Sequence, residues 1–473
     1  MNTRQPLLYC LLPAALVAAA TAADLPTPAG FEFTSGVPAL DQAYLKARQT
    51  IAGDVKDGDF LAGLNWAQVW TRDTSYSVDM ACALLHPDVS KKTLLGLREE
   101  VKDLGECWYQ DKCGHFAGWP NLTDAIVGAT GAWSLYLVTG DRDLLRPVYV
   151  RTVNSLKRAE RDAFFKEVGL FGGCSTFMES NSGYPKAYAM KGPMIAKTKA
   201  LSTNLLYYRG YLVAARLAQL LGEDAAPWQA KADALKAAIN QRLWQPAKGY
   251  YAYYLDAAGQ LDERMEGCGE AFAILYGVAD AGQAQSILRQ TPTAPCGFPC
   301  LWPQYPEWIH IKEKKHTAEY YHNGMIWPFV QGYWAWAASQ MKDVEVFGRE
   351  LDALVKLSQN ATTFMEFYFP ENGEPGGSPR QLWSASGFLS MIYHGLFGMD
   401  FTESGIRFAP VVPAQFDKLS LANVKYRGSV LAIEITGHGT KLAKFELDGK
   451  EAPPVLDGQL TGAHRIKIQM AAN

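Results

Sequence analysis

The chain has 473 residues, of which 48% are hydrophobic, with a formal charge of −3 and no run of like charges. This length exceeds one usual domain, and the apolar content is enough for a large core. The weak charge gives no reason to expect nucleic acid or a membrane surface as a partner and favours a small or neutral ligand.

Residues 1–22 have the three-part layout of an export signal. Arg4 supplies a positive charge, residues 7–20 are mostly apolar, and small residues follow at 20–23. Pro6 and Pro13 interrupt the apolar stretch, which is short for a bilayer-spanning helix, and no later window reaches 18 apolar residues. We expect cleavage near residue 22 and a periplasmic or secreted protein, with an uncleaved anchor as the alternative.

Seven cysteines follow the predicted signal. Because an exported chain meets oxidising conditions, Cys107 with Cys113 and Cys296 with Cys300 are candidate local disulfides. The odd count leaves at least one thiol free. No histidine stands at ligand spacing beside a cysteine pair, so the sequence predicts neither a metal site nor a cofactor.

From about residue 38 to residue 395 the pattern is helical and comes in pairs. One apolar stripe at helical spacing stops at Gly222, and the next begins after Pro227. The same reasoning pairs 38–54 with 74–85, 88–104 with 123–138, 142–165 with 199–221, 224–243 with 267–279, 281–290 with 324–339, and 343–357 with 383–393. About twelve helices in hairpins predict a mainly α fold, an (α/α)6 toroid over residues 23–400.

Three connections are too long and too rich in glycine or proline to be simple turns. They cover residues 166–198, 291–323 and 358–382. Loops of this length in compact domains are usually functional, so we expect the site there.

After about Thr402 the apolar period changes to two. Leu431, Ile433 and Ile435 alternate with polar or small residues, and Ile466, Ile468 and Met470 repeat the pattern. We predict a small C-terminal antiparallel β-sandwich over 401–473, whose expected role is packing, with sugar binding as the alternative.

The sharpest local pattern is Trp70-Thr71-Arg72-Asp73 at a loop-to-helix junction. Arg72 is a bidentate hydrogen-bond donor, Asp73 is an acceptor, and Trp70 with Trp66 nearby offers aromatic faces. Together these groups suit a ligand that carries several hydroxyl groups on a ring. The alternative is that Asp73 only caps the following helix.

This pattern resembles a motif near the start of the barrel in glucoamylases and related six-hairpin glycosidases, which include amylo-alpha-1,6-glucosidase-like enzymes. The resemblance continues in the same order along most of the chain, through residues 119–124, residues 321–328, and Glu366 followed by 381–387. It implies an (α/α)6 barrel with a small β-domain behind it. It also implies that Arg72 and Asp73 hold hydroxyls of the released sugar.

Cleavage of a glycosidic bond requires one carboxyl as an acid and a second as a base or nucleophile. Glu366 stands where the resemblance places the catalytic base, among apolar and aromatic neighbours. Glu371 and Glu374 are the competing candidates, and both are more typical of solvated loop charges.

Glu179 is the predicted general acid, because its loop corresponds in order to the general-acid loop of the superfamily. Apolar and aromatic neighbours are expected to raise its pKa. The alternative is a surface turn, and Asp124, Glu319 and Glu270 are the other candidates.

The remaining polar and aromatic residues of these segments are predicted to bind substrate. His322 lacks a serine or cysteine nucleophile motif, so hydroxyl binding suits it better than base catalysis. The full predicted binding set is Trp70, Arg72, Asp73, Asp124, His322, Asn323, Trp327, Gln381 and Trp383.

The sequence therefore predicts an exo-acting, inverting glycoside hydrolase for α-glucosidic oligosaccharides. Other linkages on the same fold stay open, namely mannosides, rhamnosides, trehalose and β-glucans. So do a phosphorylase, a lyase and a non-catalytic sugar-binding protein of the cell envelope. The oligomeric state is not predicted.

Overall fold

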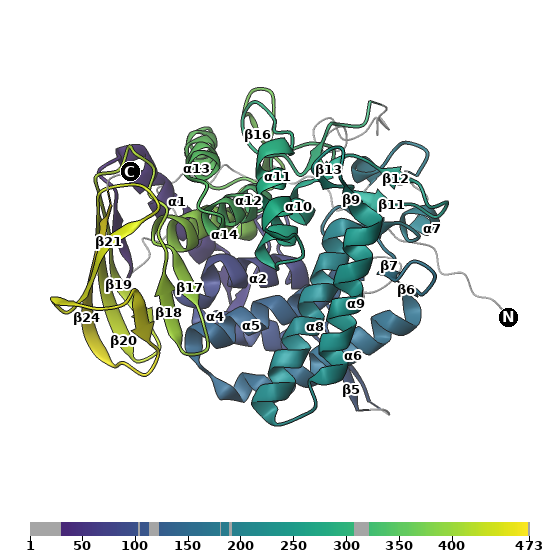
Figure 1. The fold of residues 1–473 in the computed structure, drawn as a ribbon, viewed down its shortest axis with the longest axis horizontal. Coiled ribbons are helices and arrows are strands. Elements are labelled where there is room, and N and C mark those ends of the chain that lie inside the picture. The colour runs from purple at the N-terminus through teal and green to yellow at the C-terminus, as the bar shows by residue number, and fades with distance from the viewer. Residues whose placement is uncertain are drawn as a thin grey trace.

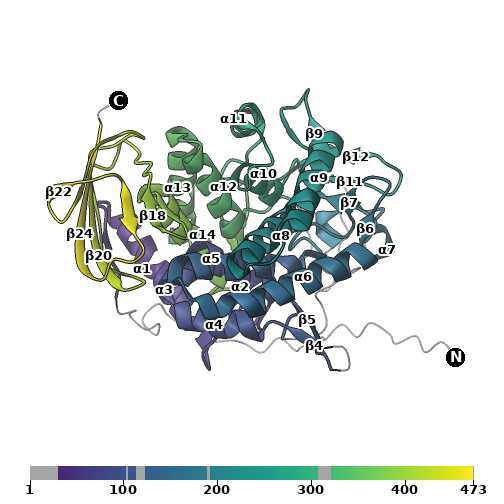
Figure 2. The ribbon, with the colours of Figure 1, turned by 60° about the horizontal axis from the view of Figure 1, so that its bottom comes forward.

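The computed structural model describes residues 30–102, 105–112, 123–179, 181–188, 192–306 and 321–471. A large helical ring occupies most of the molecule, and a β-domain lies against one side of it (Figures 1 and 2). The predicted signal segment lies outside the described residues. In the described part of the chain, no helix is both long enough and apolar enough to span a bilayer.

The helical ring has an inner and an outer layer. Each inner helix contacts the next, and the last returns to the first. The inner helices are α2 (Thr71–Ser77), α5 (Val127–Thr139), α8 (Leu201–Leu221), α10 (Gly267–Leu275), α12 (Pro328–Gln340) and α14 (Leu382–Ser390). The outer helices are α1 (Pro38–Gly53), α4 (Pro87–Gly96), α6 (Leu145–Asp162), α9 (Ala226–Leu243), α11 (Ala281–Gln290) and α13 (Val344–Gln359). The predicted (α/α)6 toroid is confirmed.

The burial of residues along each helix distinguishes the inner layer from the outer one. Every residue of α14 is buried, as expected for a helix with neighbours on all sides. The outer helices α6 and α13 instead alternate buried and exposed residues at helical spacing.

One predicted helix is shorter than expected. The pattern predicted a helix over 88–104, whereas α4 ends at Gly96 and the hairpin of β4 (Glu99–Val101) and β5 (Glu106–Trp108) follows. Glycine destabilises a helix interior, and α4 ends at Gly96.

Inner and outer helices alternate along the chain, so all inner helices run in one direction and begin at the same end of the ring. The three long connections predicted to be functional lead to the starts of α8, α12 and α14 at this end. Short strands shape this rim and the neighbouring loops: β2 (Val55–Lys56), β3 (Asp59–Phe60), β6 (Phe164–Phe165), β7 (Leu170–Phe171), β8 (Lys199–Ala200), β9 (Trp244–Gln245), β10 (Tyr250–Tyr251), β11 (Tyr254–Leu255), β12 (Leu261–Asp262), β13 (Met265–Glu266), β14 (Leu301–Trp302), β15 (Phe367–Tyr368) and β16 (Pro375–Gly376).

Aromatic side chains fill the middle of the ring. Tyr76 stacks on Phe329 at 5.4 Å between centroids, and Phe329 stacks on Trp383 at 4.3 Å. Phe272 and Tyr333 complete this layer, with their centroids 4.9 Å apart. The interior is therefore packed rather than open from end to end.

The C-terminal domain packs two sheets together. One is six-stranded, with order β1-β19-β20-β24-β21-β22, and the other has order β17-β18-β23. Phe408 and Phe445 meet between the sheets at 5.5 Å. The strands are β1 (Glu32–Thr34), β17 (Met399–Phe401), β18 (Gly405–Phe408), β19 (Lys418–Tyr426), β20 (Ser429–Thr436), β21 (Leu442–Leu447), β22 (Lys450–Glu451), β23 (Val455–Asp457) and β24 (Gly462–Met470).

These sheets agree with the predicted β-domain and add two details. The pairing is antiparallel except between β20 and β24, which are parallel. Strand β1 pairs with β19, so residues 32–34 belong to this domain, although the predicted division placed them with the barrel.

Candidate active site

The N-terminal turn of α2 presents Arg72 and Asp73 to the end of the ring where the inner helices begin. The backbone N–H of Thr71 donates to Asp111 Oδ1 at 2.6 Å, so Asp111 caps this helix. Since α2 begins at Thr71, Asp73 lies inside the helix and is not its N-cap. Asp73 instead accepts a hydrogen bond from Gln381 Nε2 at 3.4 Å.

The carboxyl of Asp73 binds its proton more tightly than an aspartate usually does. Burial raises the pKa of its carboxyl to about 7, the nearby Glu366 and Asp111 carboxyls add to this rise, and Arg72 opposes it. A carboxyl close to half-protonated at neutral pH can both donate to and accept from sugar hydroxyls.

Glu366 is positioned by the two-stranded hairpin of β15 and β16. Its backbone N–H donates to Ser378 O at 2.9 Å, and the Ser378 N–H donates to Glu366 Oε2 at 2.7 Å. Gly377 makes this close approach possible. Its φ is +75°, and a Cβ there would lie 2.3 Å from Glu366 Oε2.

Three donors converge on the Glu366 carboxylate. Besides Ser378, Tyr321 Oη donates to Oε1 at 2.6 Å and Trp66 Nε1 donates to Oε1 at 3.0 Å. Glu366 is only 3% exposed, and burial raises its pKa above the usual value, although the three hydrogen bonds oppose this rise. These contacts fix both oxygens and suit the ionised form of the group.

Glu179 forms a forked ion pair with Arg72. The distances are 2.8 Å from Arg72 Nη1 to Oε2 and 3.2 Å from Nη2 to Oε1. The Glu179 side chain is 36% exposed and that of Arg72 only 7%, so Glu179 lies on the solvent side of the pair.

The electrostatics of Glu179 differ from the expectation. Burial pushes the pKa of its carboxyl upward, but the charge and hydrogen bonds of Arg72 outweigh burial, and the net pKa lies below the usual value. The predicted rise from apolar neighbours is therefore wrong for the unliganded protein, because Arg72 dominates.

Phe177 anchors the loop that carries Glu179. Its ring meets His322, Trp327 and Phe329 edge-on, with centroids 4.9–5.2 Å apart. Its backbone lies in the left-handed region at φ 51°, which is rare for a bulky residue and is held here by the buried ring.

His322 lies in the wall beside this ion pair. It is 2% exposed, and burial lowers its pKa to about 3, with Glu179 and Arg72 close enough to act on it. It is therefore a neutral group at physiological pH. Trp327 packs behind it and donates from Nε1 to Tyr321 O at 3.1 Å, which orients the tyrosine that contacts Glu366.

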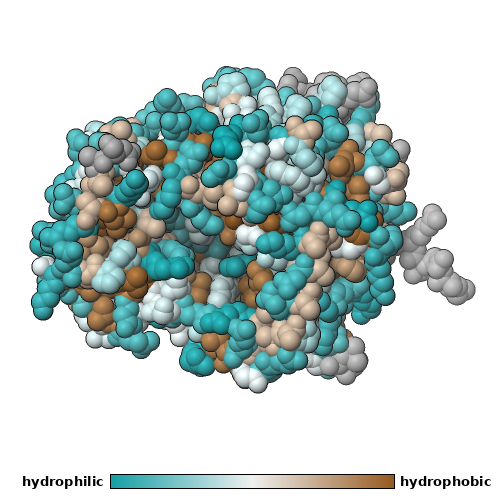
Figure 3. Space-filling model, in the orientation of Figure 1, coloured by the Kyte–Doolittle hydropathy of each residue, from teal (hydrophilic) through white to brown (hydrophobic). Residues whose placement is uncertain are grey.

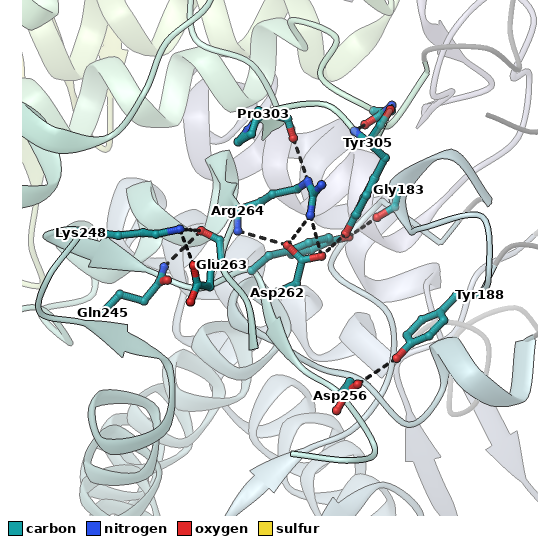
Figure 4. Close-up of polar contacts among 12 residues, drawn as sticks. Gly183, Tyr188, Gln245, Lys248, Asp256, Asp262, Glu263, Arg264, Pro303 and Tyr305 are labelled. Atoms are coloured by element: carbon teal, nitrogen blue, oxygen red, sulfur yellow. Dashed lines mark hydrogen bonds and ion pairs between the residues drawn. The ribbon is translucent and has the colours of Figure 1, made fainter. Parts of the chain in front are cut away.

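Asn323 does not face the carboxyl pair, so its predicted role in hydroxyl binding is not supported. Its carboxamide is used on the backbone of Tyr305, accepting from N at 2.7 Å and donating to O at 3.1 Å. Tyr305 in turn donates from Oη to Asp262 at 2.7 Å, below the Arg264 guanidinium (Figure 4). Asn323 thus fixes the fold of the rim.

Two side chains of α14 and its N-terminal cap offer unused polar atoms near Asp73. Among the described residues, Trp383 Nε1 and Gln381 Oε1 are buried and have no hydrogen-bond partner. Buried polar atoms without a partner are uncommon in folded proteins, and the binding role of both residues stays a prediction. Trp70 is half-buried before α2. The side chain of Asp124 lies outside the described part of the chain.

The family of the chain follows from comparison with known proteins. The model of the mannosylglycerate hydrolase MGH1-like glycoside hydrolase domain matches residues 120–384, which is more than half of the chain. The chain belongs to this glycoside hydrolase family. The model of the C-terminal domain of glycosyl hydrolase family 65 matches residues 399–459, within the β-domain.

One relative matches a third of the sequence, and solved structures share the fold. The protein-glucosylgalactosylhydroxylysine glucosidase of Gallus gallus is 26% identical over 158 residues, which cover 33% of this chain and 21% of that protein. A sialidase structure aligns with a TM-score of 0.70 and 17% identity over 89% of this chain and 40% of its own. The GH63 mannosylglycerate hydrolase of Thermus thermophilus aligns with a TM-score of 0.58 and 14% identity over 74% of this chain and all of its own. The chain thus spans about a fifth of the curated relative.

Other predicted acids of the MGH1-like domain lie elsewhere. Glu371 and Glu374 are exposed, as expected for loop charges. Glu270 is buried near Tyr251 of β10, and burial raises its pKa well above the usual range. Glu319 lies outside the described residues. Among the described residues, no acidic, histidine or cysteine cluster suits a metal ion.

The predicted disulfides are not formed where the structure describes both cysteines. Cys296 and Cys300 are both free thiols, and Cys300 Sγ donates to His322 O at 3.4 Å, so that pairing is wrong. The buried Cys300 thiol therefore forms a hydrogen bond with a neighbouring carbonyl in the wall of the site. Cys107 is also free, and Cys113 lies outside the described residues.

Several residues of the site were missing from the predicted set. Tyr321 is the first residue of the quoted motif 321–328, and Trp66 was named beside Trp70, so their position in the sequence was a usable signal. Asp111 and Ser378 had none, because their roles depend on backbone contacts made after the chain has folded.

Proposed function

We propose that the protein hydrolyses a terminal glycosidic bond with inversion, with Glu366 as the general base and Glu179 as the general acid. The observation that carries this proposal is the Glu366 carboxylate, buried and held on both oxygens by Trp66, Tyr321 and Ser378. A carboxylate held in this way can orient and deprotonate a water molecule.

Glu179 suits the acid role through its position. It is the more exposed of the two carboxyls, as suits a group that must meet a departing sugar. In the free protein Arg72 favours its ionised form. Binding of a sugar hydroxyl to Arg72 would weaken that ion pair and let Glu179 hold the proton that the leaving oxygen requires.

Exo action is supported by the gradient of exposure through the site. Trp66 is 41% exposed, while Asp73 is almost fully buried and Trp383 belongs to the aromatic layer that fills the ring. A site closed at its inner end accommodates the end of a sugar chain rather than its middle.

The proposed substrate is a neutral α-glucosidic oligosaccharide. Among the described residues, Arg72 is the cation that acts on the carboxyls of Asp73, Asp111 and Glu179. Because Arg72 already forms an ion pair with Glu179, its charge favours a neutral substrate over an anionic one. The relative from Gallus gallus is named as a glucosidase. A mannoside of glyceric acid is the second candidate, because the matching family model is named for mannosylglycerate hydrolase.

The test is turnover of gluco-, manno- and trehalose-type oligosaccharides and mannosylglycerate by the wild type, with proton NMR of the first product. Release of one terminal sugar in the inverted anomeric form supports the proposal. Retention, internal cleavage or binding without turnover of any of these sugars contradicts it. Binding alone would favour the non-catalytic sugar-binding alternative.

We further propose that the protein is exported. The charged, apolar and small-residue pattern of residues 1–23 supports this. Expression with and without residues 1–22, followed by fractionation, tests it, since a truncated chain that reaches the same compartment contradicts the proposal.

A further inference from the structure

A second recess lies at the opposite end of the helical ring from the candidate active site. Its cavity volume is about 110 Å³, and it is lined by inner helices and by β17. Figure 3 shows a hollow near the centre of this face, and Figure 1, in the same orientation, draws α2 and β17 there. The residues that matter are Asp79, Ser134, Arg209, Trp336, His394 and Phe401.

The recess is separate from the carboxyl pair. Arg72 and Asp79 are seven residues apart on the same helical segment, which is about 10 Å at 1.5 Å per residue. The buried aromatic layer of Tyr76, Phe329 and Tyr333 lies in the ring between these levels. A molecule in the recess therefore does not reach Glu179 or Glu366.

Three charged side chains line the recess. Asp400 forms an ion pair with Arg407, and the other two, Asp79 and Arg209, carry opposite charges. Asp79 is fixed by hydrogen bonds from Ser134 Oγ and from Tyr333 Oη, the latter at 2.8 Å. Arg209 is half-buried, 5.4 Å above the Tyr276 ring, and has no ion pair or hydrogen bond within the described part of the chain. A half-buried guanidinium without an acceptor is costly unless something binds to it.

Aromatic surface lies beside these charges. Trp336 stacks on His394 with centroids 3.8 Å apart and planes at 9°, and Phe401 meets His394 edge-on. His394 Nδ1 contacts Met399 O at 2.9 Å, which holds the imidazole in place. This gives the recess a rigid, partly apolar wall.

Two π-helical turns shape the same recess. Val78–Cys82 interrupts the helix that begins with α2, and Met391–Leu396 follows α14. Asp79 and His394 belong to these two turns. Such turns are rare and frequently occur at functional sites.

We propose that this recess binds a small neutral polyhydroxy compound the size of a monosaccharide, independently of the candidate active site. Arg209 supplies donors, Asp79 supplies an acceptor, and Trp336 with Phe401 covers the C–H face of the ligand. An anion would be repelled by Asp79 and a cation by Arg209, so hydroxyl groups fit both. This binding function goes beyond the proposed hydrolysis.

The experiment uses the full chain with Glu366→Gln, which stops turnover, and titrates glucose, mannose and glycerol by calorimetry and ligand-observed NMR. Arg209→Met should weaken one binding event at least about tenfold, because it removes hydrogen bonds from a charged donor. Arg216→Met is the matched control on the same helix, since Arg216 pairs with Glu403 on the surface. It should leave binding unchanged.

A second readout does not depend on the stability of Arg209→Met. Fluorine NMR of 5-fluorotryptophan-labelled protein, with the Trp336 signal assigned by Trp336→Phe, should show that signal shift on sugar addition. The shift should persist in Arg72→Met. The proposal is overturned if the Trp336 signal does not respond, or if betaine or phosphate binds the recess and the sugars do not.

Discussion

Replacing Glu366 by glutamine isolates the ionisation of the proposed base, because shape and volume are kept. Loss of a general base costs about 10²–10⁴-fold in rate, or about 3–5.5 kcal/mol of transition-state stabilisation. The free energy of unfolding falls by less than this. A glutamine has one acceptor oxygen where Tyr321, Trp66 and Ser378 now donate to two, which leaves one buried donor unsatisfied at about 1–3 kcal/mol. Removal of a buried charge offsets part of this cost.

The assay is the rate of monosaccharide release at the pH optimum, with thermal unfolding of each variant as the control for folding. Glu371→Gln and Glu374→Gln are matched controls in the same loop, since both side chains are exposed. They should stay within about twofold of wild type, as surface changes do. The assignment is refuted if Glu366→Gln keeps more than a tenth of the wild-type kcat/KM, or if either control loses as much.

Three further changes test the neighbours of Glu366. Glu179→Gln should lose at least about 10²-fold on sugar leaving groups but much less on nitrophenyl glycosides, which need little protonation; equal losses on both contradict an acid role. Arg72→Met should raise the pKa of Glu179, since the guanidinium now lowers it, so the acid stays protonated to higher pH and the alkaline limb of kcat/KM moves upward; an unmoved limb argues against this coupling. Gly377→Ala should abolish activity and cost about 1–2 kcal/mol of stability, whereas Gly222→Ala, also at positive φ but in open space, should cost only stability; activity in both variants would show that Gly377 does not position the carboxylate.

The hairpins of the ring and the strands of the β-domain were readable because periodicity is a local property of the chain. Apolar residues at helical spacing marked both layers, and the change to a period of two after about Thr402 marked the sheets. The surroundings of Glu366 were readable for the same reason. Its apolar neighbours Phe364 and Phe367 are fully buried in the folded protein.

Contacts across the ring were decided by the tertiary structure. Arg72 and Glu179 are 107 positions apart, and their ion pair sets the proton affinity of the proposed acid in the direction opposite to the one its loop suggested. Asn323 was predicted to bind sugar but instead holds the Tyr305 backbone.

The sequence by itself thus determined the helical hairpins, the family motifs and the three loops that carry the site, because each is encoded by residues close together in the chain. Only the tertiary structure decided which donor meets which carboxyl and that Asp111 caps α2. It also revealed a second recess at the far end. These features arise when closure of the ring brings distant residues within hydrogen-bonding distance, and no local pattern records that.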